Sequence, residues 1–269
     1  GWQLVSVGQS PYPRIESATG IAHFDNALGS WADKQLGKCT TMRCIVKAAA
    51  MCKYGVPKDT KVDALRKLLA EKKSVQPAEW FQAILSQGVL LINAALTMVP
   101  AGSGRADVTE HTKFWQPVLE AVVDTILTAR GKQGQGIVFA WWGGESLKTK
   151  KALARVFAKH ASVTVEHFEH KNPAAMYDAF CDEPNVFHTL NAALAKVGGT
   201  PVDWLPCEGW QSTLAVPATT SGHVPAKKAP GGGGGGGKKQ KVAGGAETAG
   251  SSSGTPAPVV HGTHVDIDA

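Results

Sequence analysis

The amino-acid sequence predicts a three-layer α/β/α sandwich built on a central, mostly parallel sheet of four strands. Short apolar runs bounded by turn residues alternate with longer segments of helical periodicity, which is typical of parallel strands covered by helices on both faces. With 269 residues, 43% of them hydrophobic and 19% charged, the chain can bury one substantial core. The four predicted strands are residues 2–7, 89–93, 137–142 and 162–168.

Helical patterns occupy the segments between and after these strands. In residues 41–53 apolar side chains recur at helical spacing, with Thr41 as a candidate N-cap and Gly55 just past the end. Residues 111–128 form the longest predicted helix, which is amphipathic. Its expected buried residues are Trp115, Val118, Val122, Ile126 and Leu127. The other predicted helices are residues 64–71, 78–87, 146–160 and 185–196.

Residues 1–210 are predicted to form one folded domain, and residues 217–269 a disordered tail. The tail is rich in Pro, Ala, Thr, Ser and Gly, and glycine fills every position of residues 231–237. Such a segment buries too little apolar surface to offset the entropy of ordering it. The chain begins at Gly1 rather than Met, almost directly at its first strand, so we expect an N-terminal part to be missing.

Net charge, cysteine content and the length of the apolar runs limit what the protein can bind and where it is expected to be located. A formal net charge of +6 suits a polyanion-binding protein, but is also common in proteins that bind no nucleic acid. The 5 cysteines form no Cys-x-x-Cys pair, which argues against a zinc site or a disulfide framework and indicates an intracellular location, nucleus or cytoplasm. No apolar run approaches the roughly 20 residues that span a bilayer, and no secretory signal is present, so no membrane association is expected.

A short motif follows directly on the first apolar run, where the predicted strand ends and a loop begins. Residues 8–13 read Gly-Gln-Ser-Pro-Tyr-Pro. This stretch resembles the water-activating motif Gly-Gln-Asp-Pro-Tyr-His of the uracil-DNA glycosylases. Ser10 stands in place of the acid, and Pro13 in place of the final His. The missing carboxylate therefore becomes the main question about activity.

Further segments resemble the same family in the same order along the chain. They match its Gln-Gly-Val-Leu-Leu-Leu-Asn strand, the strand that ends in its Gly-Ser phosphate-contacting loop, its closing helix and its Pro-Ile-Asp-Trp ending. His111 and Trp115 fall where the family has a His and a Trp opening a helix. The resemblance covers most of residues 2–206 and implies the three-layer fold. The matching segments are residues 87–97, 138–144, 187–191 and 199–204.

The resemblance implies a pocket that reads a pyrimidine base flipped out of DNA. Gln9 would contact the base, Asn93 would hydrogen-bond the Watson–Crick edge of uracil, and Tyr12 would exclude the 5-methyl group of thymine. Taken alone, Asn93 is equally well a buried strand-end amide and Tyr12 a packing aromatic. The aromatic that stacks on the base is His23 in an ungapped comparison and Phe24 after a shift of one residue, and both alternatives stay open.

Residues 169–176 stand where the family has His-Pro-Ser-Pro-Leu, a loop that carries a catalytic His and a Leu wedge. Without a gap, His170 is the catalytic His, which would stabilise the departing uracil anion. A gapped alternative aligns residues 173–175 with the His-Pro-Ala-Ala loop of the poxvirus enzymes, inserts two residues after His170, and gives Met176 the intercalating position. The residues expected to contact DNA are Thr41, Gly143, Gly144, Ser146, Lys171, Ala174 and Met176.

The chemistry implied by the family is dissociative, with a cationic sugar, an anionic base, and an acid that favours the cation and positions the water. Ser10 can hold a water but carries no charge, and loss of such a group costs about 10²- to 10⁴-fold in rate. Glu16, Asp25 or Glu169 could substitute, although each is also read as an ordinary solvated carboxylate.

The leading hypothesis is a monomeric DNA glycosylase of base excision repair that needs no cofactor and no metal. It would hydrolyse the N-glycosidic bond of uracil, or of a related pyrimidine, in single- or double-stranded DNA. The alternative is a catalytically impaired protein of the same fold that acts as a DNA-binding or assembly factor.

Overall fold

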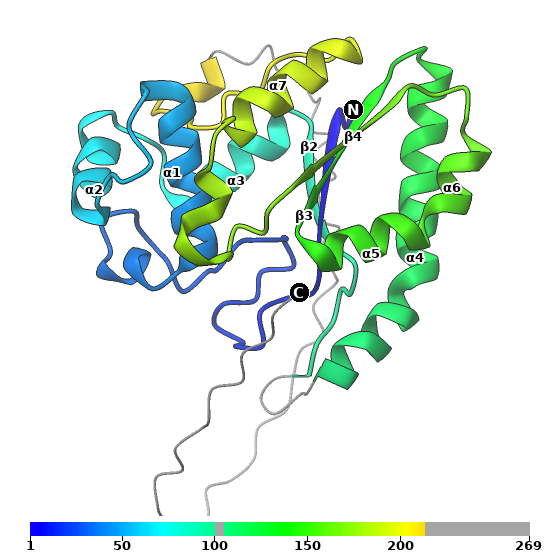
Figure 1. The fold of residues 1–269 in the computed structure, drawn as a ribbon, viewed down its shortest axis with the longest axis horizontal. Coiled ribbons are helices and arrows are strands. Elements are labelled where there is room, and N and C mark those ends of the chain that lie inside the picture. The colour runs from blue at the N-terminus through cyan, green and yellow to red at the C-terminus, as the bar shows by residue number, and fades with distance from the viewer. Residues whose placement is uncertain (100–104, 213–269) are drawn as a thin grey trace, which may run out of the picture. The chain divides into compact units, whose positions relative to one another are not determined.

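The structure is a computed structural model that describes residues 1–99 and 105–212, so the predicted tail lies outside the described residues. Its centre is a parallel sheet of four strands, as the sequence predicts, and the strand order is β2-β1-β3-β4 (Figure 1). The strands β2 and β3 coincide with the predicted ranges. The four strands are β1 (Leu4–Gly8), β2 (Val89–Asn93), β3 (Ile137–Trp142) and β4 (Val165–His170).

The outer strand β4 lies further along the chain than predicted. Its start is delayed by a turn in which the Val163 N–H donates to the carbonyl of His160 at 2.9 Å. Its end extends to His170 because the ladder with β3 continues as far as the pair Trp142 and His170. The longer ladder carries the loop after β4 to the same sheet edge as the ends of β1 and β2.

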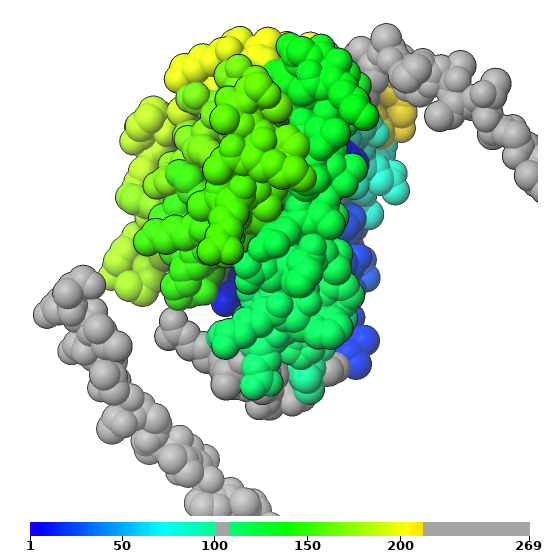
Figure 2. Space-filling view, turned by 90° about the vertical axis from the view of Figure 1, so that its right-hand side faces the viewer, coloured from blue at the N-terminus to red at the C-terminus, as the bar shows by residue number. Residues whose placement is uncertain are grey.

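Two helical layers cover the sheet, and successive side chains of its central strands point to opposite layers. One layer holds α1, α2, α3 and α7, and packs on Leu4, Val138 and Ala140. The other holds α4, α5 and α6, and packs on Val5 and Phe139 (Figures 1 and 2). The helices are α1 (Thr40–Tyr54), α2 (Val62–Glu71), α3 (Pro77–Ser86), α4 (Arg105–Lys132), α5 (Gly144–Ala152), α6 (Ala154–Lys159) and α7 (Val186–Lys196).

Of the two caps predicted for α1, the N-terminal one is wrong and the C-terminal one is confirmed. Thr41 is not the N-cap, because the helix already begins at Thr40 and Cys39 precedes it without a side-chain cap. Gly55 does close the helix with φ of 65°, and its N–H donates to the carbonyl of Met51 at 3.0 Å. Glycine adopts this left-handed conformation at little cost. Thr41 therefore lies inside the first turn, at the carboxyl-end edge of the sheet.

The buried face of α4 agrees with the predicted one at Ile126 and Leu127 and differs from it nearer the start of the helix. Val118 is 42% exposed, whereas Leu119 and Val123 are buried against the sheet together with Ile126 and Leu127. The spacing of these four side chains follows one helical stripe. The predicted helix 146–160 is also divided, because α5 ends before the buried Leu153 and α6 begins after it. Within the described ranges, no helix has the length and apolar character needed to cross a membrane.

Candidate active site

A cavity of about 200 Å³ opens at the edge where the parallel strands end, the usual place for a site in an open α/β sheet. Its wall combines the loop after β1, the ends of β2 and β3, the start of α5 and the loop after β4. Eight of the predicted site residues line it, namely Gln9, Ser10, Tyr12, His23, Thr41, Asn93, Ser146 and Ala174. The sequence prediction missed three further polar or aromatic lining residues, which are Trp142, Glu145 and Asn172.

Asn93 ends β2 with its side chain 3% exposed, opposite Gly8 in the parallel ladder. The two strand ends stay together beyond the ladder, because the N–H of Ala94 donates to the Gly8 carbonyl at 2.8 Å. A Cβ atom at position 8 would come within 2.5 Å of the Asn93 Oδ1 and 3.0 Å of the Ala22 Cβ. Glycine at position 8 is thus required for the Asn93 amide to lie against the strand end and face the cavity.

Tyr12 and Thr41 come together from different elements. Burial raises the pKa of the Tyr12 hydroxyl, and a hydrogen bond with Thr41 opposes that shift only in part. The phenol therefore stays neutral at physiological pH, so Tyr12 presents an apolar ring with a polar tip to the cavity. Thr41 contributes a hydroxyl from the first turn of α1 rather than a helix cap.

The structure separates the two candidates for the stacking aromatic. His23 lines the cavity with φ of 68°, and its ring centroid lies 4.9 Å from that of Trp142. Burial lowers the pKa of His23 to about 4, so its imidazole is neutral at pH 7. Phe24 does not line the cavity, because it is 7% exposed and stacks on Phe81 in the core at a centroid distance of 4.3 Å.

Trp142 closes the back of the cavity at the end of β3. Its side chain is 5% exposed, and its buried Nε1 has no hydrogen-bond partner among the residues that the structure describes. An unpaired indole N–H of this kind is costly unless water or a ligand accepts from it. The sequence places Trp142 at the end of an apolar strand, directly before Gly143 and Gly144. That position is compatible with a site residue, but it is equally compatible with an ordinary core residue.

Two of the predicted site residues, His170 at the end of β4 and Lys171 just after it, have partners outside the cavity. The Nε2 atom of His170 lies 3.0 Å from the carbonyl oxygen of Phe180, and its ring packs against Phe168 and Phe180. The Lys171 Nζ lies 2.5 Å from a carboxylate oxygen of Asp182. Neither residue lines the cavity, so the catalytic role expected of His170 stays a prediction.

Asn172 and Ala174 are the members of this loop that line the cavity. The Asn172 Oδ1 accepts from the N–H of Ala174 at 2.7 Å, which keeps the turn compact. Asn172 also packs on Gly143, where an added Cβ would lie 2.8 Å from the Asn172 Cβ. Both residues lie after the two-residue insertion of the gapped alternative, and the choice between that alternative and the ungapped one stays a prediction.

Beyond this turn, Met176 and Tyr177 project from the molecule, 75% and 87% exposed. Tyr177 and Asp178 both have positive φ, at 57° and 50°. Asp178 anchors the turn, because its carboxylate lies 2.6 Å from the Nζ of Lys47 and 2.9 Å from a guanidinium nitrogen of Arg43. Burial alone would raise the pKa of Asp178, but the hydrogen bonds from Lys47 and Arg43 outweigh it and hold the pKa well below its ordinary value.

The start of α5 was expected to contact phosphate through Gly143, Gly144 and Ser146. The Ser146 hydroxyl is 3% exposed and donates to the Val7 carbonyl at 3.0 Å, so it joins α5 to the end of β1. Gly143 and Gly144 form the helix start but do not line the cavity. Any phosphate contact from this segment would therefore use backbone N–H groups.

The three acids considered as substitutes for the missing carboxylate lie elsewhere. Asp25 is 3% exposed and pairs with Arg14 at 2.9 Å, and Glu169 pairs with Lys150 at 2.7 Å. Glu16 is exposed, and none of the three lines the cavity.

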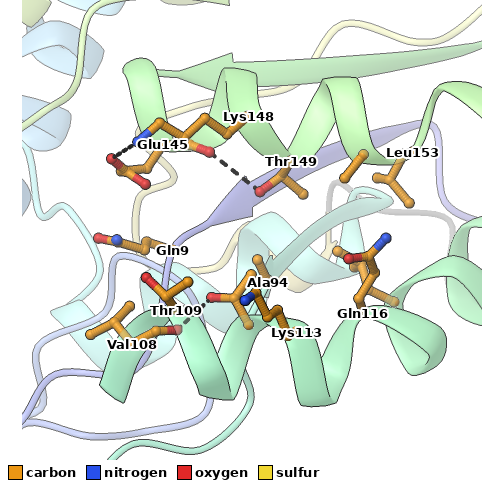
Figure 3. Close-up of a pocket in the computed structure, with 13 residues that line it drawn as sticks. Gln9, Ala94, Val108, Thr109, Lys113, Gln116, Glu145, Lys148, Thr149 and Leu153 are labelled. Atoms are coloured by element: carbon orange, nitrogen blue, oxygen red, sulfur yellow. Dashed lines mark hydrogen bonds and ion pairs between the residues drawn. The ribbon is translucent and has the colours of Figure 1, made fainter. Parts of the chain in front are cut away.

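A second cavity of about 330 Å³ lies between α4 and α5 and adjoins the first, because Gln9 and Glu145 line both (Figure 3). Its remaining wall mixes apolar side chains with hydroxyl, amide and ammonium groups. Within the described part of the chain, no group of three or more His, Cys, Asp or Glu side chains could hold a metal ion.

Comparison with known proteins relates this site to one family. No family model matches the chain. A uracil-DNA glycosylase of Streptococcus thermophilus is 34% identical over 119 residues, which cover 44% of this chain and 48% of that protein. A uracil-DNA glycosylase of Streptococcus pneumoniae is 31% identical over 150 residues, covering 56% and 63%. The chain thus spans less than two thirds of the length of these curated relatives.

Two solved structures share the fold. The wild-type UNG crystal structure from Nitratifractor salsuginis superposes with a TM-score of 0.54 at 21% identity, covering 76% of this chain and 73% of that one. A point mutant of the same protein gives a TM-score of 0.57 at 20% identity, covering 76% and 74%. In sequence the chain is thus similar to uracil-DNA glycosylases over about half of its length, and it shares the fold of the solved UNG structures.

Proposed function

We propose that the chain is a uracil-DNA glycosylase-type N-glycosyl hydrolase that flips uracil, or a related pyrimidine, out of DNA and releases it by hydrolysis in base excision repair. The observation that carries the proposal is that Gln9, Ser10, Tyr12 and Asn93 line one cavity. The first three follow the end of β1, and Asn93 ends β2. The names of the curated relatives are those of enzymes, which does not favour the alternative of a non-catalytic DNA-binding factor.

Base recognition would rest on the strand-end side of the cavity. The Asn93 amide has both a donor and an acceptor, which suits the Watson–Crick edge of uracil. Tyr12 would stand against the 5-position, while Gln9 would contact the base and neutral His23 would stack on it. Because His23 carries no charge at pH 7, it would stack without forming an ion pair with the uracil anion.

The bond-breaking step would be dissociative. The C1′–N1 bond breaks, its electron pair leaves with the base, and water held by Ser10 adds to the sugar cation. Donors aimed at the developing oxyanion of the base lower the barrier most. Asn172 lines the cavity and could donate from its side-chain amide. A role for His170 would require its ring to leave the Phe180 carbonyl when DNA binds.

DNA contacts would come from the rim. Met176 would enter the base stack from its exposed turn, with Ala174 beside it, and Lys171 would meet the phosphate backbone. Further phosphate contacts would come from Thr41 and from the N–H groups at Gly143 and Gly144. We further propose that the protein acts as a monomer in the nucleus or cytoplasm, in keeping with its five free cysteines.

The test is release of base from a single-stranded oligonucleotide that contains one uracil, with thymine in the matched control strand. We expect an alkali-labile abasic site from the uracil strand alone. If stoichiometric protein forms no abasic product overnight, the proposed activity on uracil is wrong. A panel of modified pyrimidines then defines the base that is read.

A further inference from the structure

Glu145 is the one carboxylate among the described residues that line the catalytic cavity. It lies in the first turn of α5, immediately after β3. A carboxylate there interacts favourably with the positive end of the helix dipole. Its ion pair with Lys148, at 2.7 Å, leaves the Glu145 side chain 42% exposed. A carboxylate has two oxygens and several acceptor sites, so one with this exposure can accept from a water molecule in addition to its protein partners.

The position of Glu145 relative to Ser10 is set by its neighbours. The next residue, Ser146, donates its hydroxyl to the Val7 carbonyl at 3.0 Å, which fastens the first turn of α5 to the end of β1. The N–H of Gly143 donates to the His170 carbonyl at 2.9 Å and fastens the same turn to β4. The start of α5 is therefore held at the sheet edge from which the Ser10 loop departs.

The second cavity shows how water could reach this carboxylate. Gln9 and Glu145 form the wall that the two cavities share, and their side chains lie at the same end of the pocket (Figure 3). Thr112, Gln116 and Thr149 give the second cavity hydrogen-bonding groups along α4 and α5. A cavity of this size with hydrogen-bonding groups on its wall can hold ordered water beside those groups. Water could thus arrive beside Glu145 while DNA covers the opening of the first cavity.

We propose that Glu145 supplies the carboxylate that position 10 lacks. This inference rests on the proposed glycosylase function. When the C1′–N1 bond breaks, the negative charge of Glu145 stabilises the sugar cation. Water, positioned by Ser10, forms the new bond to C1′ and passes its proton to the Glu145 carboxylate. That proton then leaves to solvent or to the uracil anion, so the step consumes one water and yields neutral uracil and an abasic sugar.

The experiment measures single-turnover uracil release from a single-stranded oligonucleotide by the full chain. It compares wild type, Glu145→Gln, Ser10→Asp, the double variant, and Glu169→Gln, which removes a lysine-paired carboxylate outside the cavity. We expect Glu145→Gln to slow release by about 10²-fold with DNA affinity retained, and Glu169→Gln to match wild type. In the Ser10→Asp background, Glu145→Gln should cost little.

The outcomes separate the two claims. If wild type releases uracil and Glu145→Gln does so at the same rate, the role of Glu145 is overturned and the glycosylase function stands. If only the Ser10→Asp proteins release uracil, the cavity reads uracil but Glu145 does not serve as its acid. If no protein releases uracil, both claims fail. A loss of release accompanied by an equal loss of DNA affinity or thermal stability would also overturn the proposal, because it marks a structural role.

Discussion

The two rims of the catalytic cavity are built in different ways. On one rim, the loop after β1 and the end of β2 are held by the parallel ladder and its backbone extension, and Gln9, Ser10 and Asn93 all face the cavity. On the other rim, the loop after β4 is held by side chains, and two residues expected to act on DNA and base, His170 and Lys171, bond within the loop instead.

The difference shows which part of the cavity is fixed by the backbone and which by side chains. A backbone ladder positions whatever side chain it carries, so Asn93 is held at the end of β2 by hydrogen bonds that do not involve the side chain of Ser10. The loop rim depends on specific partners, such as Asp178 with Arg43 and Lys47. On this rim Asn172, rather than His170 or Lys171, lines the cavity.

The largest effect is expected at the ladder-held rim. Asn93→Ala removes the amide proposed to read uracil, and loss of one such positioned group lowers kcat/KM by about 10²- to 10³-fold. Asn26→Ala, at an exposed position, is the matched control and should leave the rate unchanged. Single-turnover release of uracil measures both. Equal rates for the two variants would show that Asn93 is only a structural amide.

Gly8→Ala tests the ladder itself. The new methyl group would meet the Asn93 Oδ1 and the Ala22 Cβ, so Asn93 must shift. We expect uracil release to slow by about 10-fold or more. The free energy of unfolding should fall by about 1–3 kcal/mol. Gly29→Ala, where no atom lies within 4 Å of the added Cβ, serves as the control. Release and denaturant unfolding at wild-type values in Gly8→Ala would contradict the close packing at this strand end.

Asp178→Asn tests the loop-held rim. Loss of the charge-assisted bonds from Lys47 and Arg43 should lower the free energy of unfolding by about 1–3 kcal/mol. Because folding lowers the pKa of Asp178, its stabilisation is present above the ordinary carboxyl pKa and is lost as the pH falls below it. The gap between wild type and variant should therefore shrink as unfolding is measured at pH 5, 4 and 3.

The control for that series is Asp63→Asn, since this carboxylate is 91% exposed beside Arg66. Its substitution should cost at most about 1 kcal/mol. A wild-type to Asp178→Asn gap that stays constant down to pH 3 would show that the anchoring charge does not stabilise the fold.

The smallest effect is expected at the projecting turn. Met176→Ala removes an exposed side chain proposed to enter the base stack, and DNA affinity should fall about 5-fold, equivalent to roughly 1 kcal/mol. Phe114→Ala, a substitution of a side chain that is 73% exposed on α4, should leave affinity unchanged. Fluorescence anisotropy with labelled duplex measures both. A larger loss for Phe114→Ala would move the DNA interface to α4.

The amino-acid sequence by itself determined the sheet and the alternation of strands and helices, and it carries the resemblance to uracil-DNA glycosylases. Strands of four to eight mainly apolar residues are specified locally, and so β2 and β3 were predicted at their observed ends. The motif after β1 and the strand that ends in Asn93 also follow from local sequence. The buried residues of α4 were predicted only in part, because a buried stripe that is shifted by one residue still gives an amphipathic pattern.

Only the tertiary structure decided which side chains share the cavity. His23 rather than Phe24 lines it because Phe24 stacks on Phe81, far along the chain. His170 lies outside it because its ring bonds to the Phe180 carbonyl, and Glu145 lies inside it because Ser146 ties α5 to β1. Each of these choices is a contact between residues of different elements, at sequence separations from 10 to 139, and local periodicity carries no information about such contacts.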